Sequence, residues 1–201
     1  MQTEITVQVF ESVENILNKL ENLGYEKYNY LSGEDSYYTS ISSEEVKNST
    51  YKNLIDNSVI LRSFSVQGSQ EKTNFLLHKT KMLDDNGNVI GETKNQVKVD
   101  NSEKVKTIFN KIGLNNWVTL KQENTFLKNG EITIIVGKVK NLDGCFIEIE
   151  EYESIKEKSH EEKFNILSSF VKSLKFNLGE DFSCKKVYML YEMMQKNNNF
   201  N

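Results

Sequence analysis

The stretch VKNLDGCFIEIE, residues 139–150, ends in an alternation of apolar and acidic side chains. Alternate side chains of a β-strand point to opposite faces, so the two isoleucines would share one face and Glu148 and Glu150 the other, beside Phe146. Such a strand has an apolar back and a face with two like charges. Either that face meets solvent, or it lines a polar cavity in which the acids hold a metal ion or a cationic ligand.

The composition is that of a globular chain of one domain. Of its 201 residues, 37% are hydrophobic and 27% are charged, and the net charge is −4. This length can bury a full core, and we expect residues 1–196 to form one domain, with 197–201 as a disordered tail. The negative charge gives no general attraction for nucleic acid or an acidic membrane surface, so we expect neither as a partner. No apolar run approaches the ~20 residues that span a bilayer.

The two cysteines, Cys145 and Cys184, lie far apart and lack the spacing of a metal site. The first ten residues do not have the charged-then-apolar order of a signal peptide. Because disulfides form mainly in oxidising compartments, we expect two reduced thiols in a cytoplasmic protein.

Hydrophobic periodicity predicts two successive runs of secondary structure. Residues 3–10 alternate as a strand, and residues 12–24 have helical spacing, with Ser12 suited to the N-cap and Gly24 to the C-cap. The first run continues with strands at 35–42, 59–66, 74–82 and 92–99, the last two joined by a turn at 84–88. The second run has a helix at 101–114, with Val105, Ile108, Phe109 and Ile112 on its buried side, strands at 116–127, 131–140 and 144–152, and helices at 159–179 and 185–195.

This order predicts an α+β fold with a large antiparallel sheet, for which two architectures are open. Most of the predicted strands carry long polar or charged side chains on one face and Val, Leu and Ile on the other. An open sheet would turn its polar face to solvent and cover its apolar face with helices. A closed or nearly closed eight-stranded β-barrel, with helices packed outside, would line a tunnel with the charges and remove the exposed edges.

Over nearly the whole chain, the order of these segments resembles the CYTH superfamily, the triphosphate tunnel metalloenzymes. This family includes class IV adenylate cyclases, thiamine triphosphatases and inorganic triphosphatases. The stretch at 139–150 resembles its V-x-x-LG-x-F-x-E-I-E motif, VILRSF (59–64) its LRiR strand, LLHK (76–79) its LTxK strand and KKVYMLYEMM (185–194) its closing motif. The resemblance implies an eight-stranded antiparallel barrel that forms a tunnel.

The resemblance also implies a ligand and a cofactor. Basic side chains in the family's tunnel bind a triphosphate, and carboxylates hold Mg²⁺ or Mn²⁺. A triphosphate carries about four negative charges, so several cations must converge on it, and a divalent ion neutralises its oxygens further. The residues that match the phosphate contacts, or share their strand faces, are Arg62, Lys79, Lys81, Lys94 and Lys121, and those that match the metal ligands are Glu4, Glu148 and Glu150. Ordinary surface lysines and solvated glutamates are the alternative interpretation of the same residues.

Several positions depart from the family pattern. The substituted positions are Thr6 and Gln8 in the E-x-E-x-K strand, Phe64 for the second arginine of LRiR, Lys94 for a second acid, Glu123 for an arginine, and Gly137 for an acid. We assign no catalytic residue. The chain is expected to bind a nucleotide, thiamine triphosphate or inorganic triphosphate, with metal-dependent phosphohydrolase or adenylate cyclase activity as an open question. The alternatives are an inactive CYTH fold that sequesters a ligand or binds a protein, and an unrelated β-barrel binding protein.

Overall fold

The computed structural model describes residues 3–67, 69, 71–83 and 89–196, so the predicted turn at 84–88 and tail at 197–201 lie outside the described residues. The strands are β1 (Glu4–Val9), β2 (Glu26–Thr39), β3 (Ser58–Val66), β4 (Thr73–Leu83), β5 (Val89–Val99), β6 (Asn115–Asn129), β7 (Ile132–Val139) and β8 (Cys145–Glu150). The helices are α1 (Val13–Asn22), α2 (Ser43–Asn48), α3 (Tyr51–Asp56), α4 (Ser102–Lys111), α5 (His160–Ser173) and α6 (Lys186–Lys196), with a 3-10 turn at Glu153–Ile155. None of the described helices is long and apolar enough to cross a membrane.

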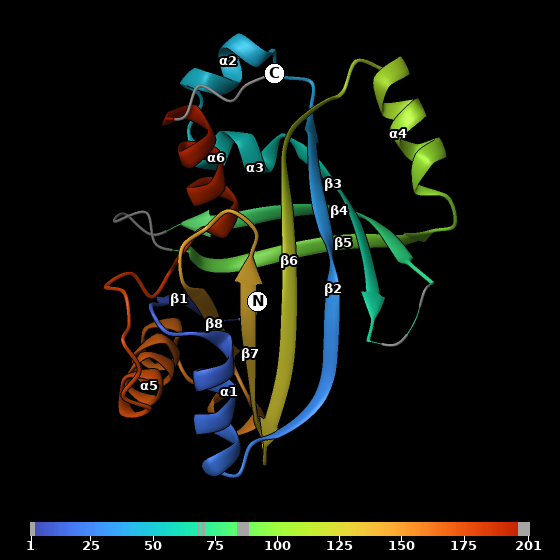
Figure 1. Ribbon diagram of the computed structural model, residues 1–201. Coiled ribbons are helices and arrows are strands. Elements are labelled where there is room, and N and C mark those ends of the chain that lie inside the picture. Colours follow the sequence, from blue (N-terminus) through green and yellow to red (C-terminus); the bar gives the residue numbers. More distant parts are fainter. Residues whose placement is uncertain (1–2, 68, 70, 84–88, 197–201) are drawn as a thin grey trace. The chain divides into compact units, whose positions relative to one another are not determined.

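The eight strands form one sheet in the order β1-β8-β7-β6-β2-β3-β4-β5 (Figure 1). The predicted α+β class is therefore confirmed, but the closed barrel is wrong, because β1 and β5 are the two ends of an open order. A segment after α5 explains why β1 does not pair further. The Phe10 amide donates to the Asn177 carbonyl at 2.8 Å, and the Gly179 amide donates to the Gln8 carbonyl at 2.8 Å. The amide of Cys184 likewise donates to the Thr6 carbonyl at 2.9 Å, so the outer edge of β1 is already occupied.

The chain divides into two compact units. Unit 1 comprises Met1–Leu31, Met82–Gly91 and Gln122–Lys185, and unit 2 comprises Ser32–Lys81, Glu92–Lys121 and Lys186–Asn201. Strands β2, β4, β5 and β6 each contribute residues to both units. The single domain expected over residues 1–196 stays a prediction.

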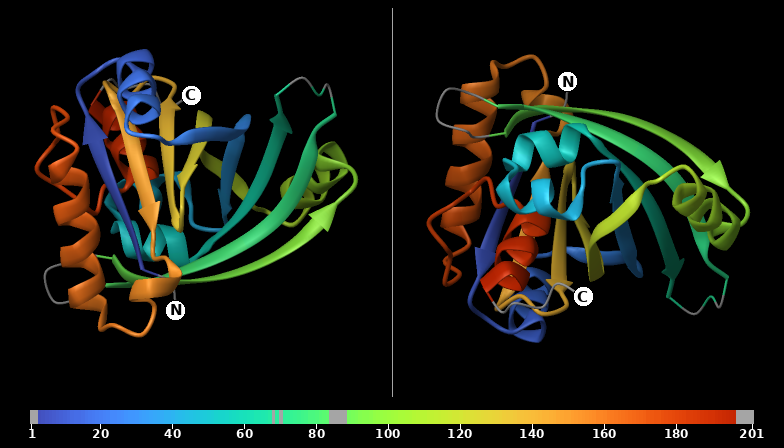
Figure 2. Two further views of the ribbon diagram at one scale, coloured as in Figure 1. Left: turned by 90° about the horizontal axis from the view of Figure 1, so that it is seen from below. Right: turned by 90° about the horizontal axis from the view of Figure 1, so that it is seen from above.

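The core of unit 1 lies between the apolar faces of β1, β7 and β8 and the helices α1 and α5. In the sheet, Ile5 pairs with Ile149 and Val7 pairs with Ile147, and all four side chains are fully buried. Leu20 from α1 and Leu167, Val171 and other residues from α5 pack against them, and α5 lies along β1 (Figure 2). Helix α1 begins as predicted, because the Ser12 side chain accepts a hydrogen bond from the Asn15 amide at 3.2 Å.

In unit 2, α4 packs against the sheet through fewer residues than predicted. Phe109 is buried with Tyr38 and Leu61, and Val105 packs against this cluster. However, Ile108 and Ile112 are 56% and 65% exposed, so their predicted burial is wrong. The helix ends one turn early, at Lys111, and Gly113 at φ +80° turns the chain so that Leu114 packs against the cluster in their place.

The sequence did not predict α2, α3 or the first half of β2. Helices α2 and α3 have six residues each, which is too short for a helical hydrophobic period to show. The first nine residues of β2, from Glu26 to Glu34, are exposed or half-buried, so they carry no strand-like alternation of buried and exposed positions. Gly33 lets β2 approach β3 closely, since a Cβ there would lie 2.2 Å from the Ser63 carbonyl oxygen.

Both cysteines are free thiols, as expected, and they lie in different environments. Cys145 is buried in the core of unit 1, and Cys184 is partly exposed. Burial raises the pKa of the Cys145 thiol to about 11, although nearby Lys138 opposes the shift. Cys145 is therefore protonated at neutral pH and acts as a small apolar side chain of the core.

Candidate functional site

The three candidate metal ligands all belong to unit 1, where β1 and β8 pair. Glu4 lies opposite Glu150, and Thr6 lies opposite Glu148. Directly opposed residues of paired strands point to the same face, so the three acids lie on the polar face that the FIEIE pattern predicts. The Thr6 hydroxyl, where the family has an acid, donates to Glu4 Oε1 at 3.2 Å. The substitution at Thr6 thus replaces a negative charge by a donor that orients Glu4.

The donor atoms of this face fit a hard divalent cation, but they do not form a complete carboxylate centre. No group of three His, Cys, Asp or Glu residues among those described is arranged to hold a metal ion. Mg²⁺ commonly takes one or two carboxylates and completes its shell with water and phosphate oxygens. Glu4 and Glu150 face each other as like charges, which a bound cation would relieve. The structure places oxygen ligands at the predicted site, and the binding of Mg²⁺ or Mn²⁺ there stays a prediction.

The lysine of the family's E-x-E-x-K strand corresponds to Gln8, which has a structural contact. Its side-chain amide donates to the Asp143 carbonyl oxygen at 2.8 Å, in the loop before β8. A glutamine carries no charge and cannot act as a base near neutral pH. Gln8 therefore ties β1 to this loop and supplies no catalytic base.

Four of the five candidate phosphate ligands lie on one face of unit 2, which we call the basic face: Arg62, Lys79, Lys81 and Lys94. Arg62 extends from β3 and forms a bidentate ion pair with Asp35 of β2. Its Nε and Nη2 donate to Asp35 Oδ1 and Oδ2, each at 2.6 Å. Asp35 is only 3% exposed, and this pairing holds the guanidinium in a fixed orientation.

Lys79 and Lys81 of β4 lie on the same face as Arg62, because Arg62 pairs with Phe75 and the side chains of β4 alternate. Both lysines contact one acid, Glu92 of β5, with Nζ–carboxylate distances of 2.9 and 3.1 Å. Burial raises the pKa of the Glu92 carboxyl, but the two ammonium groups outweigh burial and hold its pKa below the ordinary value. Lys94, two residues further along β5, points to the same side and is exposed.

The buried phenol of Tyr37 lies near these charged groups. Burial raises the pKa of its phenol well above the ordinary value, and the charges of Asp35 and Glu92 raise it further while Arg62 opposes them. Asp35 and Glu92 were missed from the sequence as members of this site. Asp35 stands in a stretch that resembles the family's Asp-x-Tyr segment, and Glu92 matches the first glutamate of its E-x-E-x-x-V strand, but neither match specifies a basic partner.

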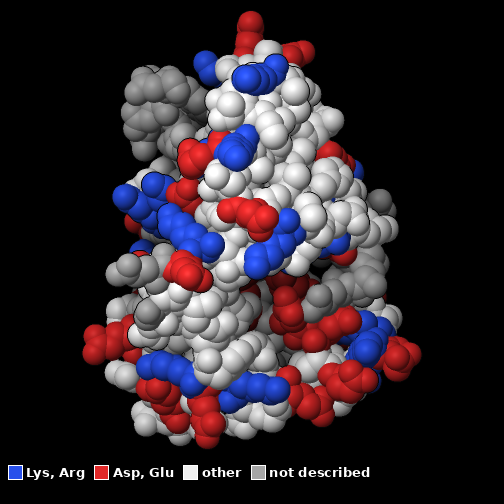
Figure 3. Space-filling model, turned by 90° about the vertical axis from the view of Figure 1, so that its right-hand side faces the viewer, with Lys and Arg blue, Asp and Glu red and all other residues white. Residues whose placement is uncertain are grey.

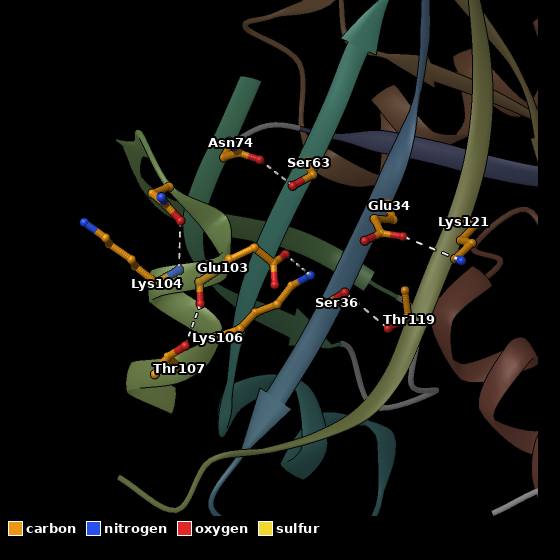
Figure 4. A network of polar contacts seen from close by, with 11 residues as sticks. Glu34, Ser36, Ser63, Asn74, Glu103, Lys104, Lys106, Thr107, Thr119 and Lys121 are labelled. Carbon is orange, nitrogen blue, oxygen red and sulfur yellow. Dashed lines mark hydrogen bonds and ion pairs between the residues drawn. The ribbon is translucent and has the colours of Figure 1, made fainter. Parts of the chain in front are cut away.

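The fifth candidate, Lys121, lies on the opposite face of the sheet in unit 2, toward α4 (Figure 4). Its Nζ is 3.8 Å from Glu34 Oε2, and its neighbour Thr119 hydrogen-bonds Ser36 at 3.2 Å. Both partners come from the side of β2 that also carries Tyr38 of the α4 cluster. The structure therefore does not bring Lys121 together with the basic face.

Two other departures from the family pattern have clear local surroundings. Phe64 stacks on Phe75 with a centroid distance of 5.9 Å and an interplanar angle of 9°, so an apolar pair replaces a second arginine beside Arg62. Glu123 lies opposite Lys138 in the β6–β7 pairing and contacts Tyr30, whose pKa is raised by burial and by that contact. On the side of the molecule in Figure 3, acidic and basic side chains lie next to each other over much of the surface, and acidic side chains gather at the lower right.

The fold and these faces define the class: an α+β protein with one antiparallel sheet that carries charged side chains on one face of each unit. No protein-family model and no curated protein matches the chain. Solved structures do match it. The PH1819 protein of Pyrococcus horikoshii aligns with a TM-score of 0.70 and 18% identity over 98% of this chain and 99% of that one.

Two further solved structures with this fold come from proteins of different kinds. HpAC1 from Hippeastrum, studied as an adenylyl cyclase and found to have a dominant triphosphatase activity, aligns with a TM-score of 0.58 and 10% identity over 96% of each chain. A chain of the Schizosaccharomyces pombe Mediator head module aligns with a TM-score of 0.56 and 11% identity over 89% of this chain and 98% of that one. The chain therefore shares its fold with these structures, and HpAC1 among them agrees with the architecture that the sequence resemblance implied.

Proposed function

We propose that the basic face of unit 2 binds a triphosphate-containing ligand. The observation that carries this proposal is the placement of Arg62, Lys79 and Lys81, which are only 27%, 19% and 22% exposed in their side chains. Long cationic side chains are mostly exposed unless they form an ion pair or bind a ligand. Asp35 pairs with Arg62, and Glu92 contacts both Lys79 and Lys81, which holds these cationic groups in place on one face.

The chemistry of the face suits a chain of phosphates. Arginine binds phosphate through a planar fork of donors, and lysine binds it as a point charge. The triphosphatase activity of HpAC1, a protein of the same fold, supports this class of ligand. Inorganic triphosphate, ATP and thiamine triphosphate share the group that these side chains would hold. Mg²⁺ or Mn²⁺ is the expected cofactor, with Glu4, Glu148 and Glu150 as its candidate ligands.

Replacing Lys79 with methionine tests the ligand. We expect tripolyphosphate to bind roughly tenfold more weakly, a loss of about 1.4 kcal/mol, because one cation of the face is removed while Glu92 remains. Isothermal titration calorimetry measures this difference. Lys104→Met on α4 is the matched control, since it removes a lysine of the same unit from outside the face and should leave the affinity unchanged. Equal affinities of the wild type and Lys79→Met would exclude the basic face as the binding site.

A second experiment tests turnover. If the bound triphosphate is hydrolysed or cyclised with a carboxylate-held cation, incubation with tripolyphosphate or ATP and Mn²⁺ should release phosphate or pyrophosphate, and Glu150→Ala should lower that rate at least tenfold. Tight binding of tripolyphosphate without any release above the Glu150→Ala level would instead identify a binding protein that sequesters its ligand.

A protein-binding module is the second candidate function, and two observations favour it. Ile108 and Ile112 of the α4 region are exposed, and a chain in the structure of the Mediator head module has the same fold. Exposed apolar side chains that lie together commonly mark a contact surface. This function would be preferred if neither tripolyphosphate nor ATP binds the wild-type protein.

A further inference from the structure

One side-chain oxygen of unit 1 is buried beside the acids without a hydrogen-bond partner. It is Oδ1 of Asn124, in the middle of β6. The great majority of buried side-chain oxygens accept a hydrogen bond, because leaving one unsatisfied has a free-energy cost. The position of Asn124 on the polar face follows from the pairing of β6 with β7, in which Asn124 lies opposite Gly137.

Gly137 shows what surrounds this oxygen. A Cβ at residue 137 would lie 2.6 Å from Asn124 Oδ1 and 3.7 Å from Glu148 Oε1. The amide oxygen of Asn124 and the carboxylate oxygen of Glu148 therefore border the same small space, next to the Cα of Gly137. A side chain at 137 would collide with Asn124 as it is placed, and the resemblance noted in the sequence implies an acid at this position. The face has lost an oxygen donor at residue 137, and Asn124 places a different oxygen donor where that side chain would begin.

We propose that Asn124 Oδ1 is a ligand, together with Glu148, of a divalent cation such as Mg²⁺ or Mn²⁺. The proposal rests on the proposed function, in which such an ion accompanies a triphosphate. Carboxylate and amide oxygens are hard donors of the kind that both ions prefer. The ion would satisfy the oxygen that otherwise has no partner. Because the amide is neutral, the site keeps one negative charge fewer than an acid at residue 137 would give, and water can complete the shell of the ion.

Binding of Mn²⁺, followed by the electron paramagnetic resonance signal of the free ion, tests this role without any measure of turnover. We expect Asn124→Leu to lower Mn²⁺ affinity about tenfold, and Asn124→Asp to keep or raise it, because aspartate retains an oxygen and adds a charge. Asn115→Leu is the matched control, since it removes an exposed asparagine from the start of the same strand, and it should leave the affinity unchanged.

Thermal unfolding without metal separates the role from a merely structural one. Since Asn124→Leu removes an unsatisfied oxygen, its unfolding temperature in the absence of metal should not fall, while the upward shift produced by Mn²⁺ should shrink. The proposal is overturned if the wild type binds no Mn²⁺, if Asn124→Leu binds it as tightly as the wild type, or if Asn124→Asp binds it more weakly. The last result would place the amide nitrogen next to Glu148.

These outcomes are distinct from those of the proposed function. Weaker Mn²⁺ binding by Asn124→Leu in a protein that does not bind tripolyphosphate would support the ligand role and reject the triphosphate. Tight tripolyphosphate binding with Mn²⁺ affinity independent of residue 124 would do the reverse.

Discussion

Replacing Arg62 with leucine should destabilise the protein by about 3–5 kcal/mol, the range typical for breaking a buried ion pair. Arg62 donates two hydrogen bonds of 2.6 Å to Asp35, whose carboxylate is 3% exposed. The substitution would leave this carboxylate without its counter-charge, beside the side chain of Tyr37, which is also buried. Urea unfolding followed by circular dichroism measures the loss.

The double variant Arg62→Leu with Asp35→Leu is the control. Removing both partners of a buried pair is often neutral, so this variant should recover most of the stability lost in Arg62→Leu. A loss below about 1 kcal/mol in the single variant would show that the pair is solvated in the native protein. If both variants are equally unstable, the loss of stability comes from placing leucine at residue 62, and the unpaired charge of Asp35 does not cause it.

This pair also affects how Arg62 can bind a ligand. Two of its five N–H donors are committed to Asp35, which fixes the plane of the guanidinium group. A phosphate would meet an oriented cation and would not have to order a flexible one, which lowers the entropic cost of binding. Weaker tripolyphosphate binding by Arg62→Leu has to be interpreted with its stability loss in view, whereas Lys79→Met avoids that complication.

The sequence predicted those parts of the fold that depend on neighbours in the chain. The alternation in FIEIE identified the buried face of β8, because Ile147 and Ile149 are fully buried against helices and a register shift of one residue would expose them. The start of α1 was predictable for a similar reason, since the Ser12 cap acts on an amide three residues away.

The remaining features depend on contacts between distant segments. The sheet is open because residues 177–184 occupy the edge of β1. That segment has no strand-like alternation of apolar and polar residues from which this pairing could be predicted. Lys121 matched a family motif, but its face depends on the pairing of β6 with β2, which a motif does not specify. Asp35 and Glu92 became visible as partners of Arg62, Lys79 and Lys81 only in the structure. Asn124 carried no sequence signal, except that an acid is absent at residue 137.

Replacing Glu92 with glutamine should tighten tripolyphosphate binding by roughly 2 kcal/mol, or about thirtyfold. Glu92 contacts both Lys79 and Lys81, so its carboxylate neutralises part of the charge that the ligand would meet. Glutamine has nearly the same shape and removes the negative charge. The tighter binding should also depend more steeply on salt, because the face becomes more positive.

The pH dependence of stability gives an independent check on Glu92. Because its pKa is lowered in the folded protein, its ionisation stabilises the fold above the unfolded value of about 4.3. That contribution is lost as the pH falls through the lower, folded value. In Glu92→Gln this part of the acid dependence should disappear, so the difference in stability between wild type and variant should narrow between pH 6 and pH 3.

Glu103→Gln is the matched control for both measurements. Glu103 also contacts a lysine at 2.9 Å, but it lies on α4 and its side chain is 78% exposed (Figure 4). An exposed pair of this kind contributes little, so this variant should change neither tripolyphosphate affinity nor the acid dependence. Weaker binding by Glu92→Gln would mean that the carboxylate is needed to hold Lys79 and Lys81 in place, and that orientation of the lysines outweighs net charge on this face. Unchanged binding would place the ligand away from all three residues.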